Sequence, residues 1–120
     1  MTLGNLPENL KEYIDVAAGL GRIMGNTKVY LRLIEIFVDN KEFDSFKECI
    51  EAGDFEKASE IAHTIKGMTG NLSFTKLYDI SSTLNVELAD GVKNDELIEK
   101  LFEAKDKTLE YIELLKNMLA

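Results

Sequence analysis

The residues with the clearest potential for chemistry lie in one short stretch, AHTIKGMTG at residues 62–70. It contains the only histidine of the 120 residues, His63, followed three and four positions later by Lys66 and Gly67, and then by Gly70. An imidazole that is neutral near neutral pH can act as a nucleophile and accept a phosphoryl group. A neighbouring lysine would stabilise the dianionic group formed. The stretch therefore indicates phosphoryl transfer through His63.

Helical periodicity predicts that His63 faces solvent. The apolar residues of this segment recur three and four positions apart and form a core-facing stripe of Ala58, Ile61, Ala62, Ile65, Met68 and Leu72. At about 100° per residue, His63 projects roughly 170° from the centre of that stripe. The same outer side is predicted to carry Ser59, Lys66, Gly67 and Gly70.

The two glycines beside the histidine need a reason. Gly67 and Gly70 each cost about 1 kcal/mol relative to Ala inside a helix, and an outward-facing glycine gains nothing in core packing. We expect the gain to be space beside the imidazole, because glycine has no Cβ. A lone surface histidine is, however, more often an ordinary solvated side chain, and the glycines could simply fray the helix end. The pattern by itself leaves both interpretations open.

The elements that must position this stretch are predicted to be helices. Apolar residues recur at helical spacing along nearly the whole chain, and Gly, Asn and Asp separate the segments. We expect helices at 7–18, 27–40, 42–52 and 55–71, a fifth between the cap Ser73 and the stop Gly91, and a last one from Asn94, with a glycine-broken connection at 19–26. Short loops between them favour an all-α fold, an antiparallel four-helix bundle with additional short N-terminal helices.

The whole chain, 1–120, is expected to form one domain with a core from about 8 to 118. The caps are predicted to be Asn26 and Asp54, with Gly53 as a stop. The residues expected inward are Leu10, Tyr13, Ile14 and Ala17 in the first helix, Tyr30, Leu33, Ile34 and Phe37 in the second, Phe43, Phe46 and Ile50 in the third, Leu77, Ile80, Leu84 and Leu88 in the fifth, and Ile98, Leu101, Phe102, Leu109, Ile112 and Leu119 in the last.

Composition argues against several classes of partner. The net charge of −8 and the absence of a basic cluster disfavour nucleic acid and anionic membrane surfaces. The richest apolar stretch, LIEIFV at 33–38, is far shorter than the roughly 20 residues of a membrane span. The single Cys49 cannot form a disulfide within the chain, so we expect it to be buried in a cytoplasmic protein. One His and one Cys are too few for a zinc site, so no metal is expected.

The segment AHTIKGMTGNLSFTKL, 62–77, resembles the signature of histidine phosphotransfer domains. The upstream segment GLGRIMGNTKVYLRLIEIF, 19–37, is similar to the helix pair that precedes it in that family, and the resemblance extends over about residues 8–118. It implies a four-helix bundle whose exposed histidine receives a phosphoryl group from an aspartyl phosphate of a receiver domain and passes it to another receiver. It also implies an apolar docking surface around the histidine.

The resemblance assigns roles to residues of this chain. His63 would be the phosphoacceptor, Lys66 would stabilise the phosphate and Gly67 would keep the imidazole accessible. Ser59 and Gly70 would belong to the face that docks the receiver. Arg22 matches a common basic position whose role the sequence does not explain.

The implied partners are response-regulator receiver domains and a sensor or hybrid histidine kinase, and we expect a monomer. The domain itself would need no cofactor, since the Mg²⁺ belongs to the receiver. It would be a phosphocarrier, a histidine phosphotransferase without ATP-dependent kinase activity of its own, because no Walker sequence or dinucleotide fingerprint is present.

Two alternatives stay open. The first is the phosphorylation domain of a chemotaxis-type histidine kinase, which shares the signature but receives its phosphate from a separate ATP-binding domain. The second is a non-catalytic helical adaptor, for which His63 would be dispensable. A hydrolase is disfavoured because neither an orienting acid nor an oxyanion hole can be placed near Ser59 and His63.

Overall fold

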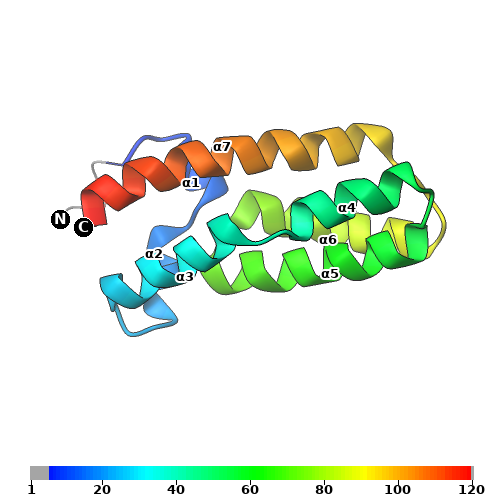
Figure 1. Cartoon of the computed structure of the whole chain (residues 1–120). Helices are drawn as coiled ribbons and strands as arrows, with labels where there is room; N and C mark the ends of the chain where they lie inside the picture. Colours follow the sequence, from blue (N-terminus) through cyan, green and yellow to red (C-terminus); the bar gives the residue numbers. More distant parts are fainter. Residues whose placement is uncertain (1–5, 120) are drawn as a thin grey trace.

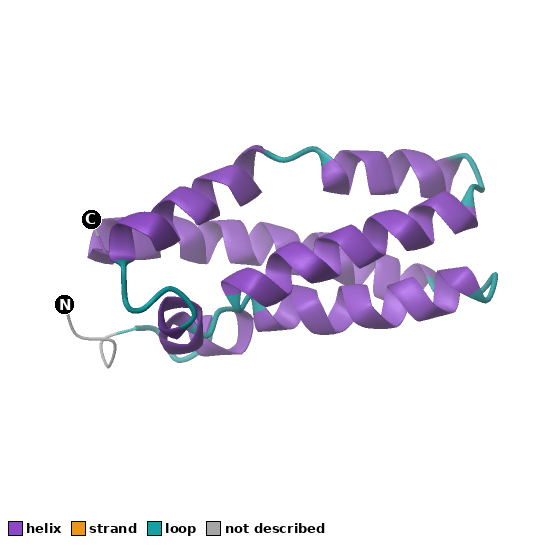
Figure 2. Cartoon of the chain, turned by 90° about the horizontal axis from the view of Figure 1, so that it is seen from below, coloured by secondary structure: helices purple, strands orange, loops and turns teal. Residues whose placement is uncertain are grey.

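The computed structural model describes residues 6–119, which form helices joined by short loops and include no strand (Figure 1, Figure 2). Residues 1–5 and 120 of the expected domain lie outside the described residues. The helices are α1 (Leu10–Tyr13), α2 (Val16–Gly21), α3 (Thr27–Asp39), α4 (Glu42–Glu51), α5 (Phe55–Leu72), α6 (Thr75–Ala89) and α7 (Asp95–Leu119). The predicted all-α class is confirmed.

The long helices run lengthwise along an elongated body of 45 × 24 × 19 Å. α5 and α6 form the most extensive helix pair, α4 packs against α5, and α7 packs against α6. Figure 1 shows α3 and α4 following one another along the same side of the body. The short helices α1 and α2 lie at the end where α3 begins and α7 finishes. This arrangement leaves one flank of α5 uncovered by other long helices.

The core follows the predicted apolar stripes in most places. Leu77, Ile80, Leu84 and Leu88 are buried in α6, and Cys49 is buried in α4, as expected. Phe37 makes edge-to-face ring contacts with Phe43 at 5.9 Å and with Phe74 at 5.0 Å, which ties α3 to α4 and to the start of α6. The side chains that are almost completely buried are Leu10, Ile14, Tyr30, Ile34, Phe46, Ile65, Phe74, Leu77, Leu84, Leu88, Leu101 and Ile112.

Most of the predicted helix ends are also confirmed. The Asn26 and Asp54 side chains each accept a backbone N–H at 3.1 Å, from Val29 and Lys57, and so cap α3 and α5. Asn94 caps α7 by accepting the N–H of Leu97 at 3.0 Å. Gly53 and Gly91 take positive φ angles of 74° and 79° just after α4 and α6, which is the conformation that favours glycine at a helix end.

The prediction of one helix over 7–18 is wrong. Ile14 is extended, with φ −137° and ψ 120°, and separates α1 from α2. Asp15 then caps α2 by accepting the N–H of Ala18 at 3.1 Å, so helix continues into the stretch predicted as a connection. The Asp15 N–H donates to the Ser73 carbonyl at 2.8 Å, a tertiary contact that stabilises the break between α1 and α2.

Two residues expected inward are exposed. Ala17 faces solvent and Val16 is buried instead, because the break at Ile14 resets the helical phase. Leu33 is 37% exposed, at the edge of the buried stripe formed by Tyr30, Ile34 and Phe37. Leu33 therefore contributes to the surface beside α5 more than to the core.

No helix within residues 6–119 has both the length and the apolar character needed to cross a membrane.

Candidate functional site

His63 lies in the middle of α5 and its side chain is exposed, as the sequence predicts. The opposite face of this helix is anchored in the core by Ala58, Ile61, Ala62, Ile65 and Leu72, all buried. Anchoring on this face fixes the backbone of His63 relative to the core, while its side chain remains on the solvent side of the helix.

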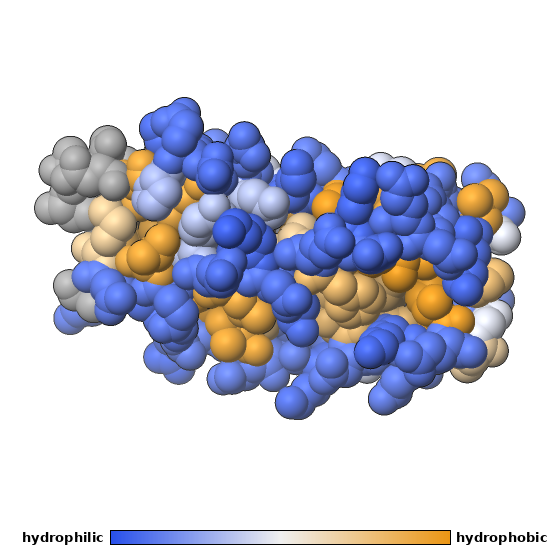
Figure 3. All heavy atoms as spheres, turned by 90° about the horizontal axis from the view of Figure 1, so that it is seen from above, coloured by the Kyte–Doolittle hydropathy of each residue, from blue (hydrophilic) through white to orange (hydrophobic). Residues whose placement is uncertain are grey.

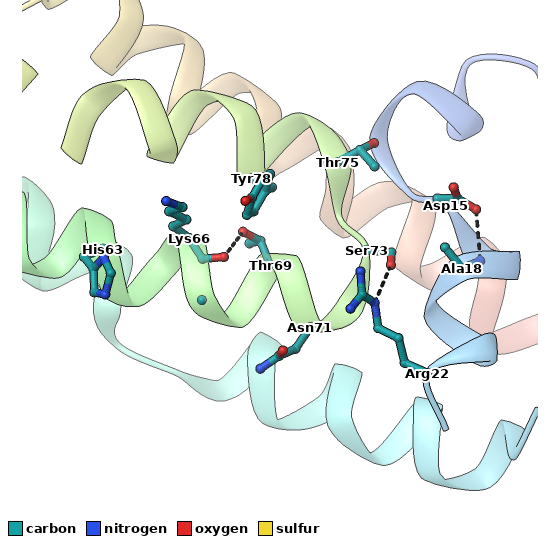
Figure 4. A pocket seen from close by; sticks show the side chains of 12 residues that line it. Asp15, Ala18, Arg22, His63, Lys66, Thr69, Asn71, Ser73, Thr75 and Tyr78 are labelled. Carbon is teal, nitrogen blue, oxygen red and sulfur yellow. Dashed lines mark hydrogen bonds between the residues drawn. The ribbon is translucent and has the colours of Figure 1, made fainter. Parts of the chain in front are cut away.

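A hollow of about 540 Å³ runs beside His63 along α5 toward α2 and the start of α6. We call it the polar groove. Figure 4 shows His63 at one end and Arg22 at the other. The residues that line it are Asp15, Ala18, Arg22, His63, Lys66, Gly67, Thr69, Gly70, Asn71, Ser73, Thr75 and Tyr78. The structure therefore brings His63, Lys66, Gly67 and Gly70 to one surface.

Gly67 faces open space. A Cβ added at this position would have nothing within 4 Å outside its own helix backbone. No packing inside the protein requires glycine here, although glycine costs about 1 kcal/mol relative to Ala in a helix. The clearance at Gly67 is therefore available to a molecule that approaches His63 from outside.

Glycine at position 70 is explained by packing inside the protein. A Cβ at Gly70 would lie 3.1 Å from Cε2 and 3.2 Å from Cδ2 of Tyr78, whose ring lies across α5 from α6. The space at Gly70 is taken by this ring, so the prediction that Gly70 leaves room beside the imidazole is wrong. Gly70 still lines the polar groove.

Lys66 lies next to the same tyrosine. Its Nζ is 6.0 Å from the centroid of the Tyr78 ring, the outer limit of a cation–π contact. Tyr78 is 38% exposed and lines the groove together with Lys66 and His63. The ring thus lies beside the lysine at one side of α5, one helical turn from the imidazole (Figure 4).

Ser59 does not belong to this surface. It is 6% exposed, and its Oγ donates to the Asn85 carbonyl at 2.7 Å. The Asn85 Nδ2 donates back to the Ser59 carbonyl at 2.9 Å and to its Oγ at 3.1 Å. The prediction that Ser59 lies on an outer docking face is wrong, because α6 covers the flank of α5 on which Ser59 lies.

Ser73 is also placed differently from the prediction. It ends α5 in a left-handed conformation, φ 58° and ψ 40°, and the N-cap position of α6 is Phe74. The Ser73 Oγ accepts a hydrogen bond from Arg22 Nε at 3.3 Å, and its carbonyl accepts the Asp15 N–H. A left-handed serine is strained, so these two contacts compensate for the conformation. They also explain where Arg22 is held.

Tyr30 of α3 holds the C-terminal end of α5 from the core side. Its hydroxyl donates to the Leu72 carbonyl at 2.9 Å in the interior. Burial, with a smaller effect of the Asp15 carboxylate, raises the pKa of Tyr30 well above its ordinary value, so the hydroxyl remains a donor. A Cβ at Gly19 would lie 2.7 Å from the Tyr30 ring, which explains glycine inside α2.

The charges in the polar groove are unlike those of the chain as a whole. The chain has a net charge of −8, yet the groove is lined by two basic side chains, Arg22 and Lys66, and by one acidic side chain, Asp15. Within residues 6–119, no three His, Cys, Asp or Glu side chains come together in a way that could hold a metal ion. The groove is thus suited to an anionic group.

A second, smaller hollow lies on the other side of α5. We call it the apolar groove. It has a volume of about 150 Å³ and is lined by Leu33, Ile36 and Phe37 of α3 and by Met68, Asn71 and Leu72 of α5. Ile36 is 60% exposed. Asn71 lines both grooves, so polar and apolar surfaces adjoin along α5.

Sequence reasoning missed Tyr78 and Asn85. Both lie on α6 and act on α5 across the helix pair, and nothing in their local spacing indicates which residues they meet. The contact between Gly70 of α5 and Tyr78 of α6 can be seen only when the two helices are packed against each other.

Comparison of the chain with protein-family models, with curated proteins and with solved structures finds no match. The geometry of the site and the resemblance of residues 62–77 therefore carry the functional proposal.

Proposed function

We propose that this chain is a phosphorelay intermediate of two-component signal transduction. His63 accepts a phosphoryl group from the aspartyl phosphate of one receiver domain and passes it to another receiver. The observation that carries the proposal is the surface around His63, where an exposed imidazole on an anchored helix has Lys66 one turn away and open space at Gly67. The alternative of an ordinary solvated histidine leaves Gly67 without a reason.

The transfer is a displacement at phosphorus. A lone pair of the neutral His63 imidazole attacks the phosphorus, the N–P bond forms, and the P–O bond to the aspartate breaks with the carboxylate as leaving group. The proton on the other ring nitrogen can leave to water. In the second transfer the aspartate carboxylate of the next receiver attacks the phosphorus, the new P–O bond forms, and the N–P bond breaks with the imidazole as leaving group, which takes a proton back from water. Lys66 offsets the charge of the phosphoryl group, and the Mg²⁺ needed for the step would come with the receiver.

The docking surface would extend over both sides of α5. The apolar groove offers Leu33, Ile36 and Met68, and the polar groove offers the cations beside His63. An interface with an apolar centre and a polar rim has this composition. Gly67 lines the polar groove one helical turn from Asn71, which lines both grooves, and a partner's backbone could approach the imidazole closely there.

The same proposal includes the finer architecture and the setting. α3 with α4, α5, α6 and α7 would form the antiparallel four-helix bundle of the histidine phosphotransfer family. The protein would act as a cytoplasmic monomer, with a sensor or hybrid histidine kinase and response-regulator receivers as partners. It would be a phosphocarrier, with most of the catalytic power on the receiver.

The test is transfer of labelled phosphate from phosphorylated receivers to the purified protein. We expect acid-labile, base-stable label on the wild type and none on His63→Gln, with circular dichroism of the two unchanged. Thr64→Ala, an exposed neighbour on the same helix, is the matched control and should be labelled like the wild type.

Equal labelling of His63→Gln would refute His63 as acceptor. Absence of label from every receiver tried would contradict the relay and favour a binding adaptor. Labelling only by the ATP-binding domain of a chemotaxis-type kinase would favour the kinase-fragment alternative.

A further inference from the structure

Arg22 is held at the end of the polar groove opposite His63. Its Nε donates to the Ser73 Oγ at 3.3 Å, and Ser73 is itself 7% exposed and fixed through its carbonyl by the Asp15 N–H. In Figure 4 the arginine side chain rises past Ser73 and its guanidinium stands over the end of α5. With Nε engaged, the terminal nitrogens of the guanidinium remain as a fork of donors that fits a carboxylate or phosphate.

No carboxylate of the described residues neutralises this arginine. The ion pairs formed within residues 6–119 lie elsewhere, on α1, α3 and α7 and in the loop before α7. Asp15 lines the same groove, but its Oδ1 accepts the Ala18 N–H as the cap of α2. In a chain with 22 acidic and 14 basic residues, an arginine that is hydrogen-bonded through Nε and has no acidic partner among residues 6–119 is a candidate anion receptor.

We propose that Arg22 forms a second anion-binding point in the polar groove and binds a carboxylate of the protein partner that docks over His63. This inference rests on the proposed function. It adds a contact separate from the phosphoryl group, because Ser73 lies ten residues, or about 15 Å, along α5 from His63. Arg22 therefore recognises the partner and takes no part in the chemistry.

Protein interfaces are wide enough for one partner to contact both His63 and Arg22. A standard interface covers about 800 Å² on each partner, which corresponds to a patch roughly 32 Å across. A partner of that size that covers His63 also reaches Arg22 if it follows the polar groove. Both ends of the groove then lie within one footprint, with Lys66 near the phosphoryl group and Arg22 near its edge.

A carboxylate carried by a docked protein fits better than a free anion. An exposed ion pair is too weak for one open arginine to retain a small anion from solution. Within a docked complex the carboxylate is already present at high effective concentration, so the same weak contact becomes useful. A fixed arginine also loses little side-chain entropy when the contact forms.

The experiment compares phosphoryl transfer from a phosphorylated receiver to wild type, Arg22→Gln and Arg22→Lys. Arg32→Gln is the matched control, since it removes the same charge from an exposed site on α3 that does not line the groove. We expect Arg22→Gln to lower the second-order rate constant about fivefold at low salt, near the upper limit for an exposed ion pair. High salt should shrink this difference, and Arg22→Lys should restore part of the loss.

A second measurement observes the contact directly. In a ¹⁵N spectrum of the arginine side chains, the Arg22 signal should shift when unphosphorylated receiver is added, while the Arg32 signal should not. Inorganic phosphate added alone at the same ionic strength should leave Arg22 unchanged, and a shift of equal size would point to a free anion instead.

Equal rates for Arg22→Gln and Arg32→Gln, with wild-type transfer intact, would overturn the role of Arg22 and leave the relay standing. The same holds if the Arg22 signal stays unmoved in the receiver complex. Absence of transfer to the wild type from any receiver would overturn both proposals.

Discussion

The outer faces of α5 and α7 differ in what they offer to solvent. α7 has no glycine among its 25 residues, and ion pairs join Lys100 to Glu96 and Lys107 to Glu110, each at 3.3 Å. Figure 3, seen from the side on which α7 lies in Figure 1, shows a largely hydrophilic surface with separate hydrophobic patches. α5 has two glycines in its second half, and none of the ion pairs formed within the described residues involves it.

The difference between α5 and α7 identifies the position at which a residue lowers helix stability without a packing reason. On α7 most exposed positions carry Glu or Lys, which favour a helix, and their charges keep the surface hydrated. On α5, Gly70 is explained by the Tyr78 ring, which leaves Gly67 as the position where glycine has no packing reason inside the protein. The contrast between the two helices therefore reduces to Gly67 and its neighbour His63.

After the complete loss expected for His63→Gln, the largest effect is expected when the open space at Gly67 is filled. Gly67→Leu should lower the rate of phosphoryl transfer from a receiver about a hundredfold, because a small displacement of reacting groups has an effect of that size. The free energy of unfolding should not fall, since a Cβ at this site meets nothing within 4 Å. Single-turnover transfer and urea unfolding measure the two effects.

Asp106→Leu places the same side chain on an exposed site of α7 and should leave transfer unchanged. Equal transfer by the Gly67 and Asp106 variants would mean that the open space on α5 has no functional role.

A smaller effect, on stability alone, is expected at Ser59 in the first half of α5. Ser59→Ala removes the hydroxyl that joins α5 to Asn85 of α6 and should lower the free energy of unfolding by about 1 to 2 kcal/mol. Phosphoryl transfer at a temperature where the protein is folded should not change. Thr64→Ala, which loses only a 3.3 Å contact to the Glu60 carbonyl of its own helix, should be nearly neutral. Full stability with impaired transfer would instead return Ser59 to the docking face.

The smallest effects separate the two glycines. Gly67→Ala should raise the free energy of unfolding by about 1 kcal/mol through helix propensity. Gly70→Ala should gain less, because its Cβ would lie 3.1 Å from the Tyr78 ring. In a Tyr78→Ala background the two substitutions should give the same gain, which thermal or urea unfolding of the four combinations measures. Equal gains with Tyr78 present would show that the ring moves away without cost.

The sequence predicted the helices and their caps well where the deciding contacts are local. Asn26, Asp54 and Asn94 cap the helices expected for them, because a cap depends on a backbone N–H three residues away. The split of the first helix could not be predicted, since the bond from Asp15 to Ser73 that accompanies it joins distant parts of the chain.

The candidate site follows the same rule: the features that depend on α5 alone were predicted, and those that depend on another helix were not. The exposure of His63 follows from the apolar stripe of α5, which the sequence displays in full. Ser59 lies one turn earlier on the same predicted face, and its burial depends on α6, whose position a helical wheel does not contain.

By itself, the sequence determined the helical class, most helix ends and the outward direction of His63, because each depends on residues within a few turns of one another. The tertiary structure decided which flank of α5 is covered, what occupies the space at Gly70 and where Arg22 is held. Those contacts join residues far apart, 26 positions for Ser59 with Asn85 and 51 for Arg22 with Ser73. Their geometry exists only after the core has fixed how the helices pack against each other.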